Sequence, residues 1–304
     1  MNNSLEKLNQ QFAIEHSVAI KQNPQSELLY IEIKNKSSTA TIQLQGAHLT
    51  DWTPVNHKPV IWLSALAKFR PGKSIRGGIP ICWPWFGAHQ THTSYPAHGF
   101  ARTALWEIES TDTVDTGKTQ IKLRLPENNI PESQWPFNTA VYCIFTIGKE
   151  LEIELVTTNN SQEDIIIGEA FHSYFNVSDV STILISGLSD CRYQDKLDDF
   201  TLKNQSGNID IKQEVDRIYI ATDHNCIIED LGFNRTISIV KKNSLSTVVW
   251  NPWLATATKM GDLGDEGYLK MICVESGNAT HDVVTLKPEQ RHNLYVRYCV
   301  DEIN

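Results

Sequence analysis

Two segments of the sequence place an ionisable side chain inside an otherwise apolar run. His172 lies in A-F-H-S-Y-F and Glu275 lies in M-I-C-V-E-S-G-N. An isolated charge in such surroundings is costly unless it has a partner or a chemical task. An imidazole and a carboxylate can give and take a proton, so together they could carry out acid–base chemistry. Either residue alone could instead belong to a buried ion pair with a structural role.

The run around His172 also predicts which way its ring points. Successive side chains of a strand alternate between its two faces, so His172 and Tyr174 should share one face. Phe171, Ser173 and Phe175 should share the other. We expect the two phenylalanines to pack in the core and fix the strand, while His172 faces a cleft.

Glycine, proline and tryptophan gather in segments that could line this cleft. The stretch I-R-G-G-I-P-I-C-W-P-W-F-G-A-H-Q (75–90) predicts a stiff, partly buried pocket wall. P-A-H-G-F-A-R puts His98 and Arg102 beside a glycine, where the backbone can approach a ligand closely. V-V-W-N-P-W-L (248–254) offers aromatic surface on which a sugar ring could stack, although buried tryptophans are common.

Several common functional motifs are matched only in part. G-K-S at 72–74 lacks the first glycine of a phosphate loop, because Ala67 occupies that position. G-D-L-G-D-E-G (261–267) fits neither a dinucleotide motif nor a calcium loop and predicts a solvated acidic turn. The six cysteines are scattered without a C-x-x-C pair, which predicts free thiols. Redox, metal and acyl-transfer chemistry therefore find no support in the motifs.

The elements that must position these residues are mostly strands. Nine segments alternate between apolar and polar residues with period two: 28–35, 40–46, 119–126, 140–147, 150–159, 181–188, 235–242, 268–275 and 292–300. Many short strands separated by Gly, Asn and Pro predict an all-β sandwich with few, peripheral helices. The best helix candidate is Ser4–Phe12. We expect one domain over residues 1–304, with 1–24 as a peripheral N-terminal segment.

Charge and hydropathy restrict the partners. The net charge of −9 argues against nucleic acid or an anionic membrane, because both require a basic face. An anionic ligand must therefore meet a local basic pocket. No run approaches the length of a membrane span, and the N-terminus does not follow the pattern of a signal peptide, so we expect a soluble, cytoplasmic protein.

Six ordered blocks resemble one family. R-G-G-I-P-I-C-W-P-W-F-G, H-G-F-A-R, E-A-F-H-S-Y-F, Y-Q-D-K-L, V-V-W-N-P-W and Y-L-K-M-I-C-V-E-S-G-N are similar to the D-hexose-6-phosphate mutarotases (glucose-6-phosphate 1-epimerases), a branch of the aldose 1-epimerase superfamily. The resemblance spans about residues 25–300. It implies a galactose-mutarotase-like β-sandwich of antiparallel sheets, a sugar in a concave cleft and no cofactor or metal. We expect a monomer whose partner is a small molecule, a hexose 6-phosphate.

The resemblance also implies roles for the two ionisable residues. His172 matches the family's general acid and Glu275 its general base. Opening a hexopyranose takes the proton from the O1 hydroxyl and protonates the ring oxygen, so these residue types suit the reaction. Rotation about C1–C2 and reclosure then give the other anomer. We expect the pair to converge on opposite sides of one bound hexose.

Substrate-binding roles follow from the resemblance in the same way. Arg76 and Arg102 match arginines that bind substrate, with the phosphate as their expected target, since guanidinium forks fit phosphate oxygens. Asp195 matches the acid that binds sugar hydroxyls, and His98 matches a pocket-lining histidine. Ala97 stands where relatives often have Gln, which leaves the preferred hexose open.

Two other functions are compatible with parts of this pattern. A non-catalytic carbohydrate-binding module would use Arg76, Asp195 and the tryptophans but would not need both His172 and Glu275. A glycoside hydrolase would need two carboxylates across the bond, for which Asp195 and Glu275 could be proposed, but the imidazole would then have no role.

Overall fold

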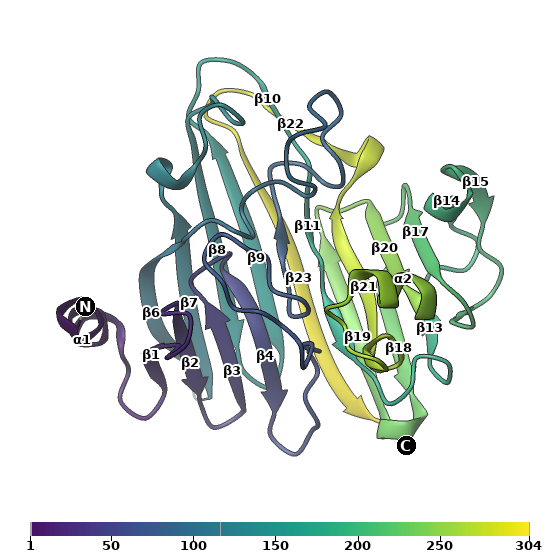
Figure 1. The fold of residues 1–304 in the computed structure, drawn as a ribbon, viewed down its shortest axis with the longest axis horizontal. Helices are drawn as coiled ribbons and strands as arrows, with labels where there is room; N and C mark the ends of the chain where they lie inside the picture. The colour runs from purple at the N-terminus through teal and green to yellow at the C-terminus, as the bar shows by residue number, and fades with distance from the viewer. Residues whose placement is uncertain (1, 116, 304) are drawn as a thin grey trace.

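The structure is a computed structural model that describes residues 2–115 and 117–303, and it is built mainly of antiparallel strands (Figure 1). All nine segments with period-two alternation form strands. The prediction of an all-β fold is confirmed.

The largest sheet has nine strands, and every pairing in it is antiparallel. Their order is β16 (Ile209–Asp210), β13 (Leu184–Ser186), β18 (Cys226–Asp230), β19 (Arg235–Lys242), β23 (Arg291–Glu302), β9 (Leu151–Asn159), β8 (Thr139–Ile147), β7 (Lys118–Leu125) and β6 (Glu107–Asp115). In β8 every second residue is buried, as expected for a strand with one face on the core.

A second sheet carries the candidate site residues. It contains β15 (Thr201–Asn204), β14 (Arg192–Asp195), β17 (Val215–Tyr219), β20 (Ser246–Asn251), β21 (Met271–Asn278), β11 (Glu169–Phe171) and β5 (Ile81–Cys82), with β12 (Tyr174–Asn176) also paired to β21. All eight residues of β21 are buried, so this strand is covered on both faces. The segment 268–275 was therefore placed only approximately by alternation, since the strand runs over Met271–Asn278 and residues 267–270 form a 3-10 turn.

Two small sheets and a short N-terminal helix complete the β-rich framework. The four-stranded sheet contains β1 (Val18–Gln22), β2 (Leu29–Lys34), β3 (Ser38–Gln43) and β4 (His48–Pro54), and a two-stranded sheet pairs β10 (Ile165–Ile167) with β22 (Val284–Leu286). The predicted N-terminal helix is confirmed as α1 (Asn2–Phe12), which contacts β1 and β6. Phe12 and Val18 are buried, so the N-terminal segment contributes to the core at the β1 edge of the four-stranded sheet.

The alternation pattern did not predict the second helix, α2 (Trp253–Met260), which follows β20 directly. Asn251 accepts a hydrogen bond from the backbone N–H of Trp253 at 2.8 Å, and Gly261 ends the helix in a left-handed conformation with φ 68°. Short 3-10 turns occur at η1 (Glu127–Asn129), η2 (Lys196–Asp198), η3 (Leu231–Phe233), η4 (Gly267–Lys270) and η5 (Thr280–Asp282). Among the described residues, no helix has the length and apolar character needed to cross a bilayer.

The four- and eight-stranded sheets both pack on the nine-stranded sheet (Figure 1). The indole of Trp52 in β4 donates to the carbonyl of Gly148, between β8 and β9, at 3.3 Å. Ser173, between β11 and β12, shares a hydrogen bond of 2.6 Å with the hydroxyl of Tyr298 in β23. The side chains between the sheets form one contiguous hydrophobic core. All six cysteines are free, which confirms the prediction of free thiols.

The predicted alternation around His172 is confirmed, although the strand is interrupted there. Phe171 and Phe175 are fully buried in the core, and Ser173 points toward β23. The rings of His172 and Tyr174 stack on each other, with centroids 4.9 Å apart. The aromatic core residues therefore fix the direction in which His172 points.

A second histidine–glutamate pair lies between β11 and β23, and so joins the eight- and nine-stranded sheets. Nε2 of His292 in β23 is 3.3 Å from Oε1 of Glu169 in β11. Glu169 is fully buried, and among the described residues its carboxylate oxygens have no well-aligned hydrogen bond. Burial raises the pKa of this carboxyl well above its usual value of 4.5. Glu169 should therefore be protonated in the folded protein.

Replacing Glu169 with Gln should stabilise the protein increasingly as the pH rises. The folded chain retains a proton that the unfolded chain releases above its usual pKa of 4.5, so wild-type stability falls as the pH rises through the folded pKa. An amide does not titrate, and we expect a gain of about 1–3 kcal/mol at the alkaline end. Denaturant unfolding at about pH 5 and about pH 8 measures it. An equal difference between the two proteins at both pH values would contradict the protonated state.

Candidate active site

The two predicted acid–base residues lie next to each other. Nδ1 of His172 is 3.2 Å from Oε1 of Glu275, and their side chains are 12% and 2% exposed. The geometry follows from strand pairing. Phe171 pairs with Ser276 and Tyr174 pairs with Cys273 across β21, which leaves His172 beside Glu275. The expectation that the two groups stand on opposite sides of the ligand is wrong, because neighbouring strands hold them side by side.

Aromatic rings hold the imidazole in place. Tyr174 stacks on the His172 ring with an angle of 8° between the planes. Trp250 meets the ring edge-on at 5.9 Å, and the backbone N–H of His172 donates to the carbonyl of Pro80 at 3.0 Å. The ring is therefore fixed from two sides.

The pair retains free hydrogen-bonding capacity. Among the described residues, Nδ1 of His172 and Oε2 of Glu275 are buried without a well-aligned hydrogen bond. Buried polar atoms are usually satisfied, and each exception needs an explanation. A substrate hydroxyl is a suitable partner for Oε2 of Glu275, whereas Nδ1 of His172 already faces Oε1 of Glu275 at 3.2 Å.

Burial sets the protonation of the pair. It raises the pKa of Glu275 well above 4.5, and the nearby carboxylate of Asp216 adds to this effect. It lowers the pKa of His172 well below 6.5, and His98 and Arg102 lower it further. Both shifts favour the state in which the pair holds a single proton, on the Glu275 carboxyl. Because Nδ1 of His172 lies 3.2 Å from Oε1 of Glu275, that proton can pass to His172, which gives the form that ring opening requires.

The predicted arginines stand around the pair with part of their donors already engaged. Nε of Arg76 donates to Oδ1 of Asp262 at 3.0 Å, and its Nη1 donates to the Tyr174 hydroxyl at 2.9 Å. Nη2 of Arg102 donates to the carbonyl of Ala97 at 2.7 Å. A guanidinium has five N–H donors, so both arginines retain donors for a ligand.

A cavity of about 920 Å³ opens beside His98. Its lining includes residues 84–90, which confirms that this half of the glycine- and proline-rich stretch forms a pocket wall. The Ala97 side chain also lines the cavity, so the small residue in place of glutamine leaves space there. The size is near the upper end for small-molecule pockets.

His98 joins this cavity to the reactive pair. Its ring meets the His172 ring edge-on at 5.7 Å, and its Nδ1 accepts from the backbone N–H of Gly87 at 3.3 Å. Burial and then Arg102 lower its pKa to about 3, so His98 stays neutral. A side chain on the adjacent Gly99 would lie 1.9 Å from the carbonyl oxygen of Trp83, which explains why glycine is needed there.

Asp195 is oriented toward other partners. Its Oδ2 accepts from Nζ of Lys203 at 2.8 Å, and its Oδ1 accepts from the backbone N–H of Leu197 at 3.1 Å. The cavity is lined instead by the residues on either side, Gln194 and Lys196. A role for Asp195 in binding sugar hydroxyls therefore remains a prediction without a contact to the cavity.

Lys196 was missed by the sequence analysis. Its ammonium is 2.6 Å from Oδ2 of Asp216, and its charge lowers the pKa of Glu275. No sequence pattern singled it out. β14 ends at Asp195 and Lys196 begins the turn η2, where strand alternation no longer sets the direction of a side chain.

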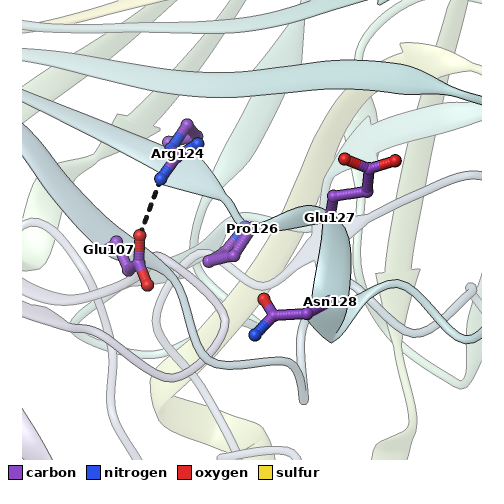
Figure 2. A pocket seen from close by; sticks show the side chains of 5 residues that line it. All are labelled: Glu107, Arg124, Pro126, Glu127 and Asn128. Atoms are coloured by element: carbon purple, nitrogen blue, oxygen red, sulfur yellow. Dashed lines mark hydrogen bonds and ion pairs between the residues drawn. The ribbon is translucent and has the colours of Figure 1, made fainter.

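A second pocket can be set aside as the reaction site. This pocket has a volume of about 440 Å³ and is lined by Glu107, Arg124, Pro126, Glu127 and Asn128 (Figure 2). Arg124 pairs with Glu107 at 2.9 Å, and both side chains are about half exposed. None of these lining residues is an imidazole, and surface pairs of this kind contribute little.

Comparisons with known proteins agree with this fold and site. The sequence profile described as aldose 1-epimerase matches residues 30–299. A Salmonella typhimurium protein with the provisional name glucose-6-phosphate 1-epimerase is 36% identical over 255 residues, covering 84% of each chain. A Salmonella typhimurium crystal structure, provisionally described as a mutarotase, has a TM-score of 0.86 and 33% identity and covers 98% of this chain and 99% of its own.

A galactose mutarotase related enzyme from Lactobacillus acidophilus shares 15% identity with a TM-score of 0.68, covering 90% of this chain and 99% of its own. At this identity the likeness concerns the fold alone. The predicted galactose-mutarotase-like β-sandwich is confirmed.

Proposed function

The chain belongs to the aldose 1-epimerase family and is an isomerase, and we propose that it interconverts the α and β anomers of a hexose 6-phosphate, with glucose 6-phosphate as the preferred substrate. The main support is the His172–Glu275 pair, which is held 3.2 Å apart beside a cavity-lining histidine. The provisional names of the relatives support the choice of a phosphorylated sugar.

Ring opening requires one base and one acid at the anomeric centre. Glu275 takes the proton of the O1 hydroxyl as the C1–O1 bond becomes a carbonyl, and His172 protonates the ring oxygen as its bond to C1 breaks. O1 and the ring oxygen are both attached to C1, so groups that stand side by side can reach both. Rotation about C1–C2 and the reverse proton transfers close the ring as the other anomer.

Ring opening removes one proton from the sugar and returns one to it, and a pair that holds a single proton can do both. One proton moves from O1 to Glu275 and one moves from His172 to the ring oxygen, so the pair again holds one proton after opening. The 3.2 Å separation then allows direct transfer from Glu275 to His172. Solvent need not supply or remove a proton in either direction.

The whole chain carries a net charge of −9, but positively charged side chains lie near the site. Arg102 and Arg76 retain free N–H donors, and the ammonium of Lys196 lines the cavity. We propose Arg102 as the main phosphate ligand, with Arg76 and Lys196 as further contacts, since charge-assisted hydrogen bonds to phosphate are the strong class.

Arg102→Met should reduce kcat/KM for glucose 6-phosphate by about 10–100-fold, because a hydrogen bond to a charged group contributes roughly 1.5–3 kcal/mol. Exchange of free glucose anomers should change little. Saturation-transfer NMR of both sugars measures the rates. Arg124→Met, in the second pocket (Figure 2), is the matched control, because Arg124 pairs with Glu107 and does not line the cavity beside His98. An equal loss for both sugars would exclude Arg102 as a phosphate ligand.

The alternative readings find less support. A non-catalytic sugar-binding module is not favoured in a family of epimerases. A glycoside hydrolase would need Asp195 across the sugar from Glu275, whereas the Asp195 carboxylate is engaged by Lys203.

A further inference from the structure

Cys273 lies beside the reactive pair and has no part in the proposed reaction. It is two residues from Glu275 on β21, so both side chains leave the same face of the strand. Cys273 is fully buried. Its Sγ makes no hydrogen bond to any other residue that the structure describes. The thiol thus has no evident partner at a site where its neighbours are reactive.

Three different donor atoms converge at this point. The ligand atoms of His172, Cys273 and Glu275 all lie within 4.8 Å of one another. Typical zinc bond lengths place neighbouring donors of a tetrahedral site about 3.4–3.6 Å apart. The His172–Glu275 distance is already 3.2 Å, and the sulfur lies within 4.8 Å of both atoms, so binding requires the three groups to draw closer by about 1 Å at most. Oε2 of Glu275 is buried without a partner, which is a second sign that the cluster can accept a ligand.

We propose that His172, Cys273 and Glu275 form a binding site for Zn²⁺, and that the ion inhibits the enzyme by occupying its acid and its base. Imidazole, thiolate and carboxylate are the three ligand types that zinc uses in proteins. Three protein ligands leave the fourth position to water on the cleft side. The inhibition rests on the function proposed above, whereas the binding does not.

The chemical types of the three ligands also indicate which metal ion the site prefers. A thiolate and an imidazole favour Zn²⁺ over Mg²⁺ or Ca²⁺, which prefer oxygen ligands. The ion must enter through the cleft, because His172 is the one member with appreciable exposure, at 12%. Substrate and ion therefore use the same lone pairs, and inhibition should be competitive with hexose 6-phosphate.

Co²⁺ serves as a spectroscopic probe of this site, since a cobalt–thiolate bond gives charge-transfer absorption in the near ultraviolet. The wild-type protein should show this band on addition of Co²⁺ and lose it on addition of Zn²⁺. Cys273→Ser should lack the band and keep the rate measured without Zn²⁺. It should also require at least about tenfold more Zn²⁺ for inhibition, because even the loss of a residue that only supports a metal ligand typically lowers metal affinity by about that factor. Mg²⁺ should have no effect on either protein.

Cys191→Ser is the matched control, because Cys191 also lies near an imidazole, 3.5 Å from Nδ1 of His224. It should behave like the wild type in both measurements. A second control removes the exposed neighbours His89 and His92 by substitution with Gln, since their rings lie 5.2 Å apart near the cavity.

Three results would overturn the proposal: no cobalt–thiolate band in the wild type, a band that persists in Cys273→Ser, or Zn²⁺ inhibition of equal potency in both. Should Cys273→Ser fail to fold, Cys273→Ala takes its place. Zn²⁺ should then raise the unfolding midpoint of the wild type and not that of Cys273→Ala. A band without anomer exchange would retain the metal site and reject the proposed function, so the two failures can be told apart.

Discussion

Glu275→Gln is expected to abolish the acceleration of anomer exchange while the fold remains intact. The amide has nearly the same shape as the acid but cannot take the O1 proton, so the loss should reach about 10²–10⁴-fold. Because the folded protein already disfavours a charged carboxylate here, the neutral amide should not destabilise it. Saturation-transfer or line-shape NMR of glucose 6-phosphate measures the exchange rate, and circular dichroism checks the fold.

The chain provides a matched control for this experiment. Glu169 is also a buried glutamate beside a histidine, on a strand that pairs with β21, but it faces the core between the sheets. Glu169→Gln should retain the wild-type exchange rate. Normal exchange in Glu275→Gln, or an equal loss in both variants, would remove Glu275 from the mechanism.

His172→Asn should lower the exchange rate by a similar factor, about 10²–10⁴-fold, because no group then protonates the ring oxygen. The smaller side chain also loses its stack on Tyr174, so some loss of stability is expected. His292→Asn is the matched control, since His292 forms the other histidine–glutamate pair.

The double variant tests whether the two groups act as a unit. If His172 and Glu275 share one proton, the second substitution should cost little once the first is made. His172→Asn combined with Glu275→Gln should therefore be about as slow as the slower single variant. Multiplied losses would show that the two residues act independently.

Local sequence patterns predicted much of the secondary structure. Period-two alternation identified strands such as β8, where one face packs on the core, and helical periodicity identified the helix at Ser4–Phe12. Alternation was less informative where both faces are covered, as in β21. It also gave no sign of α2, whose end depends on the backbone conformation of Gly261.

The site was harder to predict because it depends on contacts between distant strands. Pairing across β21 decides that His172 meets Glu275 directly, and no local pattern contains that information. The side-by-side arrangement was therefore missed. The two-residue spacing places Cys273 on the same strand face as Glu275, but no local pattern shows that His172 meets both residues. Lys196 was missed because it follows the end of β14, where strand alternation no longer predicts which way a side chain points.

The hydrogen bond between Ser173 and Tyr298 has a consequence for heat inactivation. It ties the interruption beside His172 to the longest strand of the opposite sheet. Arg235, on the next strand, adds a bond of 2.6 Å to the carbonyl of Asn176. The strand break beside His172 is thus bonded to the opposite sheet at two points, so it should open only when the sheets separate. Turnover should persist on warming until the whole sandwich melts.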